Sequence, residues 1–285
     1  MLGELLALSA ALMWATSSVL YRHGMERLSP KVVNTVRALS ATLFLFLVLI
    51  ILGRAGEVFS LSPKIYFYAL IASVFGLSVG DIFYLYAIKT IGISRAIPIA
   101  SSTPWIVAVL SVLFLGEKIT PTIIAGILLI FCGIYLIREK DEVRERKSWG
   151  FVFALAAAAS WSIYILISKL ALTEVNPIVF NTARMSFFAI AYIIVMIPSS
   201  QKKDVILVKR KEWWYVLMGA ILDLAGGAVA FYFSLTLIEA SRATPLSSLS
   251  PVFATLFAYL FAHEKITPRL ATGIAICLLG IFVLM

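Results

Sequence analysis

The sequence "GEKITP" at residues 116–121 returns almost unchanged as "HEKITP" at residues 263–268. The glutamates of the two copies, Glu117 and Glu264, are 147 residues apart, which is close to half of the 285-residue chain. A motif that recurs at this spacing suggests that the chain consists of two copies of one unit.

The same shift of 147 residues aligns many other positions without a change of register. The matched pairs include Trp14 with Trp161, Asn34 with Asn181, Arg37 with Arg184, Gly80 with Gly227, Pro98 with Pro245, Ser101 with Ser248, and Pro104 with Pro251. Because one register holds along the whole length, the sequence predicts a tandem duplication.

The composition indicates a membrane protein. Hydrophobic residues make up 61% of the chain and charged residues 14%, whereas soluble domains have roughly 45–50% and about 25%. A helix needs about 20 apolar residues to cross a bilayer, and ten stretches approach this length. They run over roughly 3–21, 32–52, 65–89, 96–115, 119–137, 149–168, 177–197, 212–237, 243–262 and 266–285. We therefore expect an all-α integral membrane protein with ten transmembrane helices.

An odd number of helices in each copy has a topological consequence. Five spans put the second copy into the membrane upside down, as in the inverted repeats of many secondary transporters. We expect a first five-helix repeat at residues 1–138, a basic cytoplasmic linker at 139–148 and a second five-helix repeat at 149–285.

The loop charges predict the orientation. Loops on one predicted face carry 17 lysines and arginines, and loops on the other carry five. Cytoplasmic loops are enriched in these residues, so both termini are expected on the non-cytoplasmic side. The expected location is the cell membrane, as a multi-pass protein.

Other classes of protein find little support. The histidines His23 and His263 lie at helix ends without a zinc motif, and Cys132 and Cys277 lie alone in apolar runs. There is no nucleotide-binding P-loop and no basic stripe with interleaved aromatic residues. We expect no enzymatic activity, no cofactor, no metal and no nucleic acid. The expected partners are a small-molecule substrate and the lipid bilayer, and the sequence is compatible with a monomer.

The doubled motifs resemble a known family. They are the tryptophans Trp14 and Trp161, the Pro-x3-Asn-Thr-x-Arg patterns that end at Arg37 and Arg184, the proline pairs of the fourth and ninth helices, and the glutamates that follow these helices. The chain is similar in these features to EamA-type members of the drug/metabolite transporter superfamily. The resemblance implies export or exchange by alternating access through a cavity between the halves. It does not fix the substrate, because members carry amino acids, other metabolites, sugar derivatives and drugs.

Two stretches rich in proline and hydroxyl groups are candidates for the binding wall: "IPIASSTPWIV" at 97–107 and "TPLSSLSPVFA" at 244–254. Each proline leaves a backbone carbonyl without its helical partner, and in lipid that carbonyl must find another. Broken helices near the membrane midplane often bind polar substrates in transporters. Alternatively, the hydroxyl groups only satisfy the freed carbonyls.

Charged residues inside the apolar runs need compensation, because an intramembrane charge is costly. Asp81 and Asp223 are the only acids well inside these runs, and they are not equivalent in the two copies. Ion pairs Arg37–Asp81 and Arg184–Asp223 are one hypothesis. The alternative is that each arginine snorkels to the nearby interface or caps a helix end, and we favour such a structural role. A proton-coupling role for either aspartate is a further alternative.

We therefore predict a secondary transporter that exports or exchanges amino acids or similar small metabolites, with a channel or lipid scramblase as the alternative. Its cavity is expected between helices 1, 3, 4, 6, 8 and 9. The candidate substrate-binding residues are Trp14, Ser17, Asp81, Tyr84, Ser101, Ser102, Trp105, Trp161, Tyr164, Asp223, Ser247 and Ser248. The candidate structural or gating residues are Arg37, Arg184, Pro98, Pro104, Pro245 and Pro251.

Overall fold

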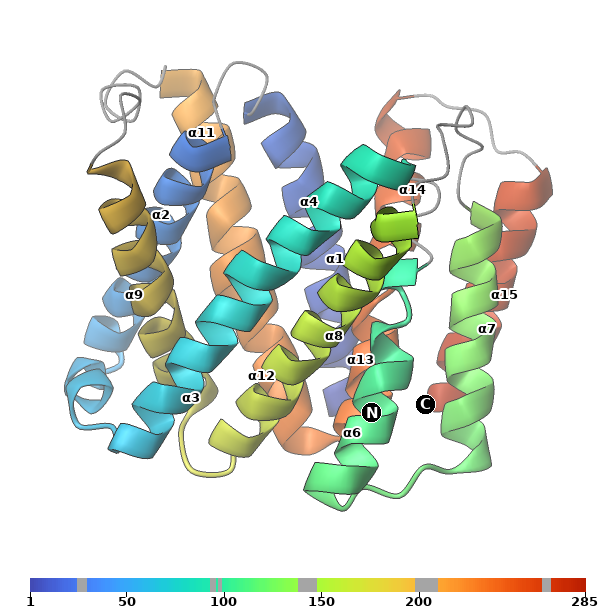
Figure 1. The fold of residues 1–285 in the computed structure, drawn as a ribbon, viewed down its shortest axis with the longest axis horizontal. Coiled ribbons are helices and arrows are strands. Elements are labelled where there is room, and N and C mark those ends of the chain that lie inside the picture. The colour runs from blue at the N-terminus through green and yellow to red at the C-terminus, as the bar shows by residue number, and fades with distance from the viewer. Residues whose placement is uncertain (25–29, 93–95, 97–98, 138–147, 198–209, 263–267) are drawn as a thin grey trace.

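The structure is a computed structural model that describes residues 1–24, 30–92, 96, 99–137, 148–197, 210–262 and 268–285. Within these residues the chain forms helices and no strand. Figure 1 shows the helices running side by side along one direction, with several short connections along the lower edge of the view.

Both halves of the chain have a similar order of helices, although each half contains one short helix without a described counterpart in the other. The first half contains α1 (Leu2–Gly24), α2 (Pro30–Ile51), the short 3₁₀ helix η1 (Ala55–Phe59), α3 (Pro63–Ser73), the π-helical segment η2 (Val74–Val79), α4 (Gly80–Ile91), α6 (Thr103–Leu115) and α7 (Pro121–Ile137). The second half contains α8 (Ser148–Ala171), α9 (Pro177–Met196), α11 (Arg210–Ala220), the π-helical segment η3 (Ile221–Gly227), α12 (Ala228–Leu237), α13 (Ala240–Ser247), α14 (Ser250–Ala262) and α15 (Pro268–Leu284).

Six helices in the described part of the chain are long and apolar enough to cross a membrane. They are Leu2–Tyr21, Val32–Ile51, Pro63–Ile91, Trp149–Ala171, Pro177–Met196 and Glu212–Leu237, and three shorter apolar helices are Thr103–Leu115, Pro121–Ile137 and Ala271–Leu284. The prediction of an all-helical membrane protein is confirmed at this level. The count of ten spans stays a prediction. So does the orientation, because most of the basic loop residues behind it lie outside the described residues.

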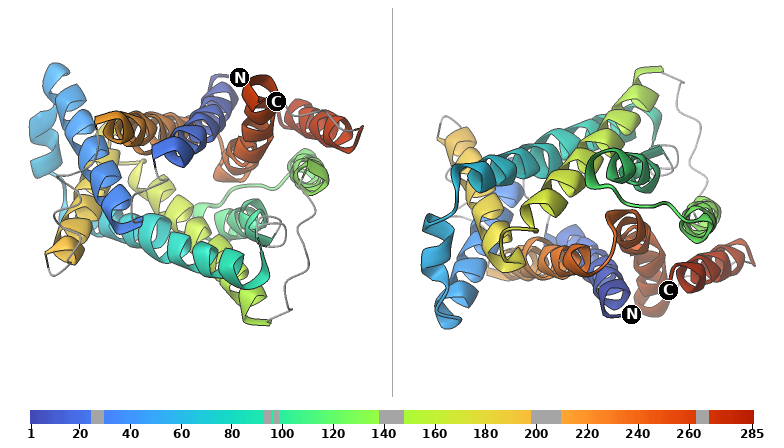
Figure 2. Two further views of the ribbon diagram at one scale, coloured as in Figure 1. Left: turned by 90° about the horizontal axis from the view of Figure 1, so that it is seen from above. Right: turned by 90° about the horizontal axis from the view of Figure 1, so that it is seen from below.

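The helices form two layers, and each layer combines the first helix of one half with later helices of the other half. Helix α1 of the first half packs against α11, η3, α12, α13 and α14 of the second half. In the same way α8 of the second half packs against α3, η2, α4 and α6 of the first half. The two views of Figure 2 show these layers facing each other. Any space between the layers is therefore lined by both halves.

Two helix pairs close the ends of the layers, α2 with α9 and α7 with α15. In the second pair, a Cβ added to Gly133 would lie 2.3 Å from Cys277 Sγ, and one added to Gly280 would lie 2.8 Å from Ile130. At the 147-residue spacing, Gly133 corresponds to Gly280 and Cys277 corresponds to Ile130, so the two contacts are equivalent. The two helices therefore cross through glycines placed symmetrically about a local two-fold axis.

The fourth and ninth predicted helices are broken at equivalent places. Turns at residues 101–102 and 248–249 precede α6 and α14, and Pro104 and Pro251 follow these turns. Pro104 cannot bond the carbonyl of Ala100, and the Thr103 hydroxyl donates to that carbonyl instead, at 2.8 Å. The expectation that hydroxyl groups satisfy carbonyls freed by proline is confirmed here.

Glycines on the third and eighth predicted helices admit the tryptophans of the opposite layer. A Cβ added to Gly80 would lie 2.6 Å from the Trp161 indole, and one added to Gly227 would lie 2.8 Å from the Trp14 indole. Both contacts lie at the ends of the equivalent π-helical segments η2 and η3. No pattern in the sequence indicated these π-helical turns.

The repeated motif of the opening sequence links the halves. Thr120 accepts a hydrogen bond from the backbone N–H of Ile123 and so caps the start of α7. Glu117 reaches the other half, where its carboxylate accepts from the backbone N–H groups of Ala240 (2.7 Å) and Ser241 (3.1 Å). Glu117 thus caps the N-terminus of α13 in the other half of the chain. In the second copy of the motif, residues 263–267 lie outside the described residues.

The two ends of the chain lie together on one face. Arg242, near the start of α13, pairs with Glu4 at 3.3 Å and donates to the backbone oxygen of Met285 at 2.8 Å. Chain ends on one face are compatible with the predicted even number of crossings.

Candidate functional site

A central cavity of about 430 Å³ lies between the two layers. Its wall is formed by α1, η3, α12 and the broken α13–α14 helix on one side, and by η2, α4, the start of α6 and α8 on the other. The cavity therefore lies where the sequence predicted it. In addition, Arg37 of α2 and Arg184 of α9 reach it from the end of the layers.

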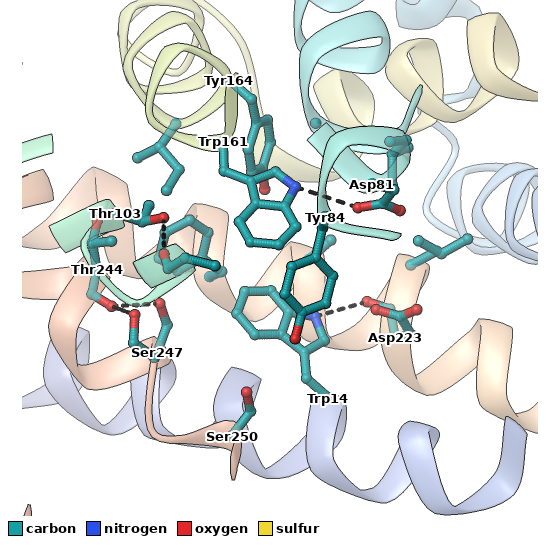
Figure 3. A pocket seen from close by; sticks show the side chains of 18 of the residues that line it. Trp14, Asp81, Tyr84, Thr103, Trp161, Tyr164, Asp223, Thr244, Ser247 and Ser250 are labelled. Atoms are coloured by element: carbon teal, nitrogen blue, oxygen red, sulfur yellow. Dashed lines mark hydrogen bonds between the residues drawn. The ribbon is translucent and has the colours of Figure 1, made fainter. Parts of the chain in front are cut away.

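Aromatic rings occupy the middle of the cavity. The rings of Tyr84 and Trp161 lie 5.3 Å apart between centroids, and those of Trp14 and Phe231 lie 5.6 Å apart. In Figure 3 the rings of Tyr84, Trp161 and Trp14 separate the two aspartates from the hydroxyl groups of Thr103, Thr244 and Ser247. The cavity thus has a carboxylate end and a hydroxyl end, with an aromatic section between them.

The ion pair at the carboxylate end differs from the prediction. Arg37 Nη2 lies 2.6 Å from Asp223 Oδ2, and the pairing with Asp81 was wrong. The reason is the exchange of helices between layers: α2 packs against η3 of the other half, which carries Asp223, whereas α4 with Asp81 faces α8. The Tyr21 hydroxyl also donates to Asp223, at 3.2 Å.

The predicted pairing of Arg184 with Asp223 was also wrong. Arg184 is buried, and its guanidinium lies 5.2 Å from the ring centroid of Tyr164 and 5.4 Å from that of Tyr232. Its Nε and Nη2 donate to Asn181 Oδ1. Aromatic faces stabilise a cation electrostatically, so Arg184 is held without a carboxylate among the described residues.

The doubled Asn-Thr-x-Arg pattern has one structural role in both halves. Asn34 Oδ1 accepts from Arg37 Nη1 at 2.9 Å, as Asn181 does from Arg184. Residues three apart on a helix share a face, so each asparagine orients the arginine that follows it. The sequence analysis did not predict this orienting role for either asparagine.

Asp81 is the carboxylate without a cation. It accepts a hydrogen bond from Trp161 Nε1 at 3.3 Å, and it forms no ion pair with any residue in the described ranges. The cavity therefore contains one neutralised pair, one separate carboxylate and one separate guanidinium.

Most of the predicted site residues line this cavity. They are Trp14, Asp81, Tyr84, Ser101, Trp161, Tyr164, Asp223, Ser247 and Ser248, together with Arg37, Arg184 and Pro251. Their roles in binding or gating stay predictions. The hydroxyls of Ser247 and Ser248 both donate to the carbonyl of Thr244, which satisfies them within their own helix.

Five predicted residues do not line the cavity. Ser17 is buried and donates to the carbonyl of Trp14 within α1. Trp105 packs into an apolar cluster with α7 and α15 residues, and Pro104 and Pro245 are buried beside the helix breaks. The Ser102 hydroxyl is buried without a hydrogen-bond partner in the described structure. Pro98 lies outside the described residues.

Several cavity residues were not predicted. Thr103, Thr244 and Ser250 line the cavity. They belong to the hydroxyl-rich stretches that were predicted to form its wall, but other residues of these stretches were named as candidates. Gly76 and Phe231 carry no sequence signal of their own. Gly76 could have been found from the repeat, because it is the counterpart of Asp223.

An all-helical bundle with membrane-length apolar helices and a central cavity of mixed polarity defines a multi-pass membrane transporter. Residues 1–138 and 148–285 match the EamA-like transporter family. The chain belongs to this family, within the drug/metabolite transporter superfamily, and the predicted resemblance is confirmed.

Similar proteins support this assignment. The chain is 29% identical over 285 residues to an uncharacterized transporter of Archaeoglobus fulgidus, covering 100% of this chain and 98% of the relative. It is 24% identical to the uncharacterized transporter YoaV of Bacillus subtilis, covering 96% of this chain and 94% of the relative. One protein of known crystal structure superposes with a TM-score of 0.79 at 19% identity, covering 99% of this chain and 95% of the other, which shows a shared fold.

Proposed function

We propose that this transporter exports or exchanges amino acids or similar small metabolites by alternating access. The observation that carries the proposal is the cavity between the two layers, because both halves contribute polar and aromatic side chains to it. A rocking of one layer against the other would open this cavity to each side of the membrane in turn.

The proposal includes ten membrane spans in two inverted repeats. Supporting it, contacts related by the 147-residue shift recur between the halves, as in Gly133–Cys277 with Gly280–Ile130 and Gly80–Trp161 with Gly227–Trp14. The proposed repeats are residues 1–138 and 149–285, joined by a cytoplasmic linker at 139–148. The proposed location is the cell membrane, with both termini on the non-cytoplasmic side.

The dimensions and charges of the cavity support a small amphoteric substrate. Its volume of about 430 Å³ lies in the range of roughly 300–1,000 Å³ found for small-molecule sites. Asp81 and Arg184 offer opposite charges that no described side chain neutralises by ion pairing. Amino acids carry both complementary charges.

Asp81 is also the better candidate of the two aspartates for coupling transport to protons. Asp223 is committed to Arg37 at 2.6 Å, whereas Asp81 forms no ion pair among the described residues. Proton-coupled transport should depend on a pH gradient and lose that dependence in Asp81→Asn. Flux that ignores both the gradient and the substitution would exclude this role.

Counter-flow in proteoliposomes tests the proposed function. Vesicles loaded with a mixture of unlabelled amino acids should transiently accumulate a labelled one, with a rate that saturates. A channel would show flux without saturation or counter-flow, and a scramblase would move fluorescent lipid between leaflets instead.

A further inference from the structure

We propose that Asp81 and the aromatic rings around it form a subsite for an ammonium group of the substrate. This inference rests on the proposed function, since it names the chemical group that one end of the transport cavity binds. Substrates with a cationic amine next to an apolar or aromatic body would fit this end.

Asp81 carries a negative charge that no described cation pairs with. Arg37, the arginine that the sequence suggested as its partner, has its Nη2 2.6 Å from Asp223 instead. Among the described residues, Asp81 receives only the neutral N–H of Trp161, at 3.3 Å. A carboxylate inside an apolar helix bundle is costly unless a positive charge approaches it, and in this cavity a ligand can supply that charge.

The cavity walls around Asp81 are aromatic. Trp161 donates to Asp81, and its ring lies 5.3 Å from that of Tyr84. Trp14 enters the same section of the cavity from the opposite layer. Indole and phenol faces attract ammonium groups, so a cation beside Asp81 would contact a carboxylate and aromatic faces at the same time.

Asp81 has no equivalent carboxylate in the other half of the chain. The shift of 147 residues takes Asp81 to Ala228, so the second half has no such carboxylate. Meanwhile Gly80, beside Asp81, is needed for the packing of Trp161, as Gly227 is for Trp14. The packing of the tryptophans is duplicated and the carboxylate of Asp81 is not, so this packing does not require Asp81.

Binding of three probes that share a phenyl ring tests the proposal on the purified full-length chain in detergent. The probes are phenethylamine, the neutral 2-phenylethanol and the anionic 3-phenylpropionate. Binding is measured as the concentration-dependent rise of the thermal unfolding midpoint, followed by intrinsic fluorescence. Phenethylamine should bind most tightly, and Asp81→Asn should weaken it by roughly tenfold to a hundredfold, as for hydrogen bonds to charged groups, while the alcohol stays unchanged.

Matched variants keep the test decisive. Glu57→Gln alters a carboxylate in an exposed ion pair outside the cavity and should leave all three probes unaffected. If Asp81→Asn does not fold, Tyr84→Leu should weaken phenethylamine a few-fold through the lost ring, as is typical of cation–π contacts, whereas Tyr84→Phe should retain it.

Equal binding of the alcohol and the amine, or no binding of the amine, would overturn the subsite. So would amine binding that survives both Asp81→Asn and Tyr84→Leu. Saturable counter-flow combined with such a result would leave the proposed function standing. If amines bound through Asp81 but no saturable flux were measured, the subsite would stand and the transport proposal would fail.

Discussion

At the scale of single residues, one difference between the copies sets the charge pattern of the cavity. Arg37 and Arg184 are equivalent, but Arg37 meets Asp223 in η3, whereas the counterpart of Asp223 in η2 is Gly76. Tyr164 packs over Gly76, with its ring 2.9 Å from where a Cβ would lie, and Arg184 lies against that ring. The substitution of a carboxylate by an aromatic contact leaves Arg184 free to meet an anionic group.

Removal of the Asp223 charge should destabilise the protein more than removal of the Asp81 charge. Asp223→Asn leaves Arg37 partly buried beside a neutral group, and we expect a loss of about 2–4 kcal/mol in unfolding free energy, as for broken buried pairs. Asp81→Asn removes a carboxylate that forms no ion pair with a described residue, so it should change the unfolding free energy little. Thermal unfolding in detergent compares the two variants, and equal midpoints would contradict the assigned pair.

The glycine contacts predict a second stability difference. In Gly80→Ala the new Cβ would lie 2.6 Å from the Trp161 indole and 2.7 Å from the backbone oxygen of Phe75. We expect destabilisation of about 1–3 kcal/mol, which is typical of overpacking. Gly56→Ala is the matched control, because a Cβ there meets nothing within 4 Å. Indistinguishable unfolding midpoints for the two alanine variants would refute the close packing of Trp161.

The sequence identified most cavity residues but not their partners. Intramembrane aspartates, arginines and doubled tryptophans stand out against apolar surroundings, so Asp81, Arg37 and Trp14 were found directly. The pairing of Arg37 with Asp223 depends on the exchange of α1 and α8 between the layers, and no local pattern encodes which helix packs beside α2.

At the scale of elements, the helix breaks and the π-helical segments recur at equivalent positions in both halves. The breaks at 101–102 and 248–249 were predictable, because Pro104 and Pro251 cannot continue a helical hydrogen-bond ladder. The π-helical segments η2 and η3 were not, since they contain no residue type that specifies five-residue bonding. π-helical turns are frequent at functional sites, and here η3 carries Asp223 while Asp81 lies two residues after the end of η2.

The cap on α13 gives a prediction at this scale. Glu117→Ala removes the carboxylate that accepts from Ala240, Ser241 and the Ser241 hydroxyl. We expect a loss of about 1 kcal/mol, the usual value of a helix N-cap, with a smaller loss for Glu117→Gln. Glu239→Ala is the control, because Glu239 precedes α13 without a side-chain cap. The midpoint of chemical unfolding measures all three, and a larger effect of Glu239→Ala would disprove the capping role of Glu117.

At the scale of the whole molecule, the halves are interlocked rather than placed side by side. Each layer takes its first helix from one half and the rest from the other, and the ends are closed by α2 with α9 and α7 with α15. Neither half can bury its glycine faces alone. The cavity is therefore complete only when both halves are present.

The most direct test of this account is the sidedness of two equivalent loops in intact cells. In a background with Cys132→Ala and Cys277→Ala, single cysteines replace Gly56 and Lys203, which are 147 residues apart. Inverted repeats predict opposite sides for the two cysteines. With the proposed orientation, a membrane-impermeant maleimide labels the Gly56→Cys protein in intact cells and the Lys203→Cys protein only after lysis. Labelling of both cysteines from the same side would contradict the inverted duplication and the cavity mechanism that follows from it.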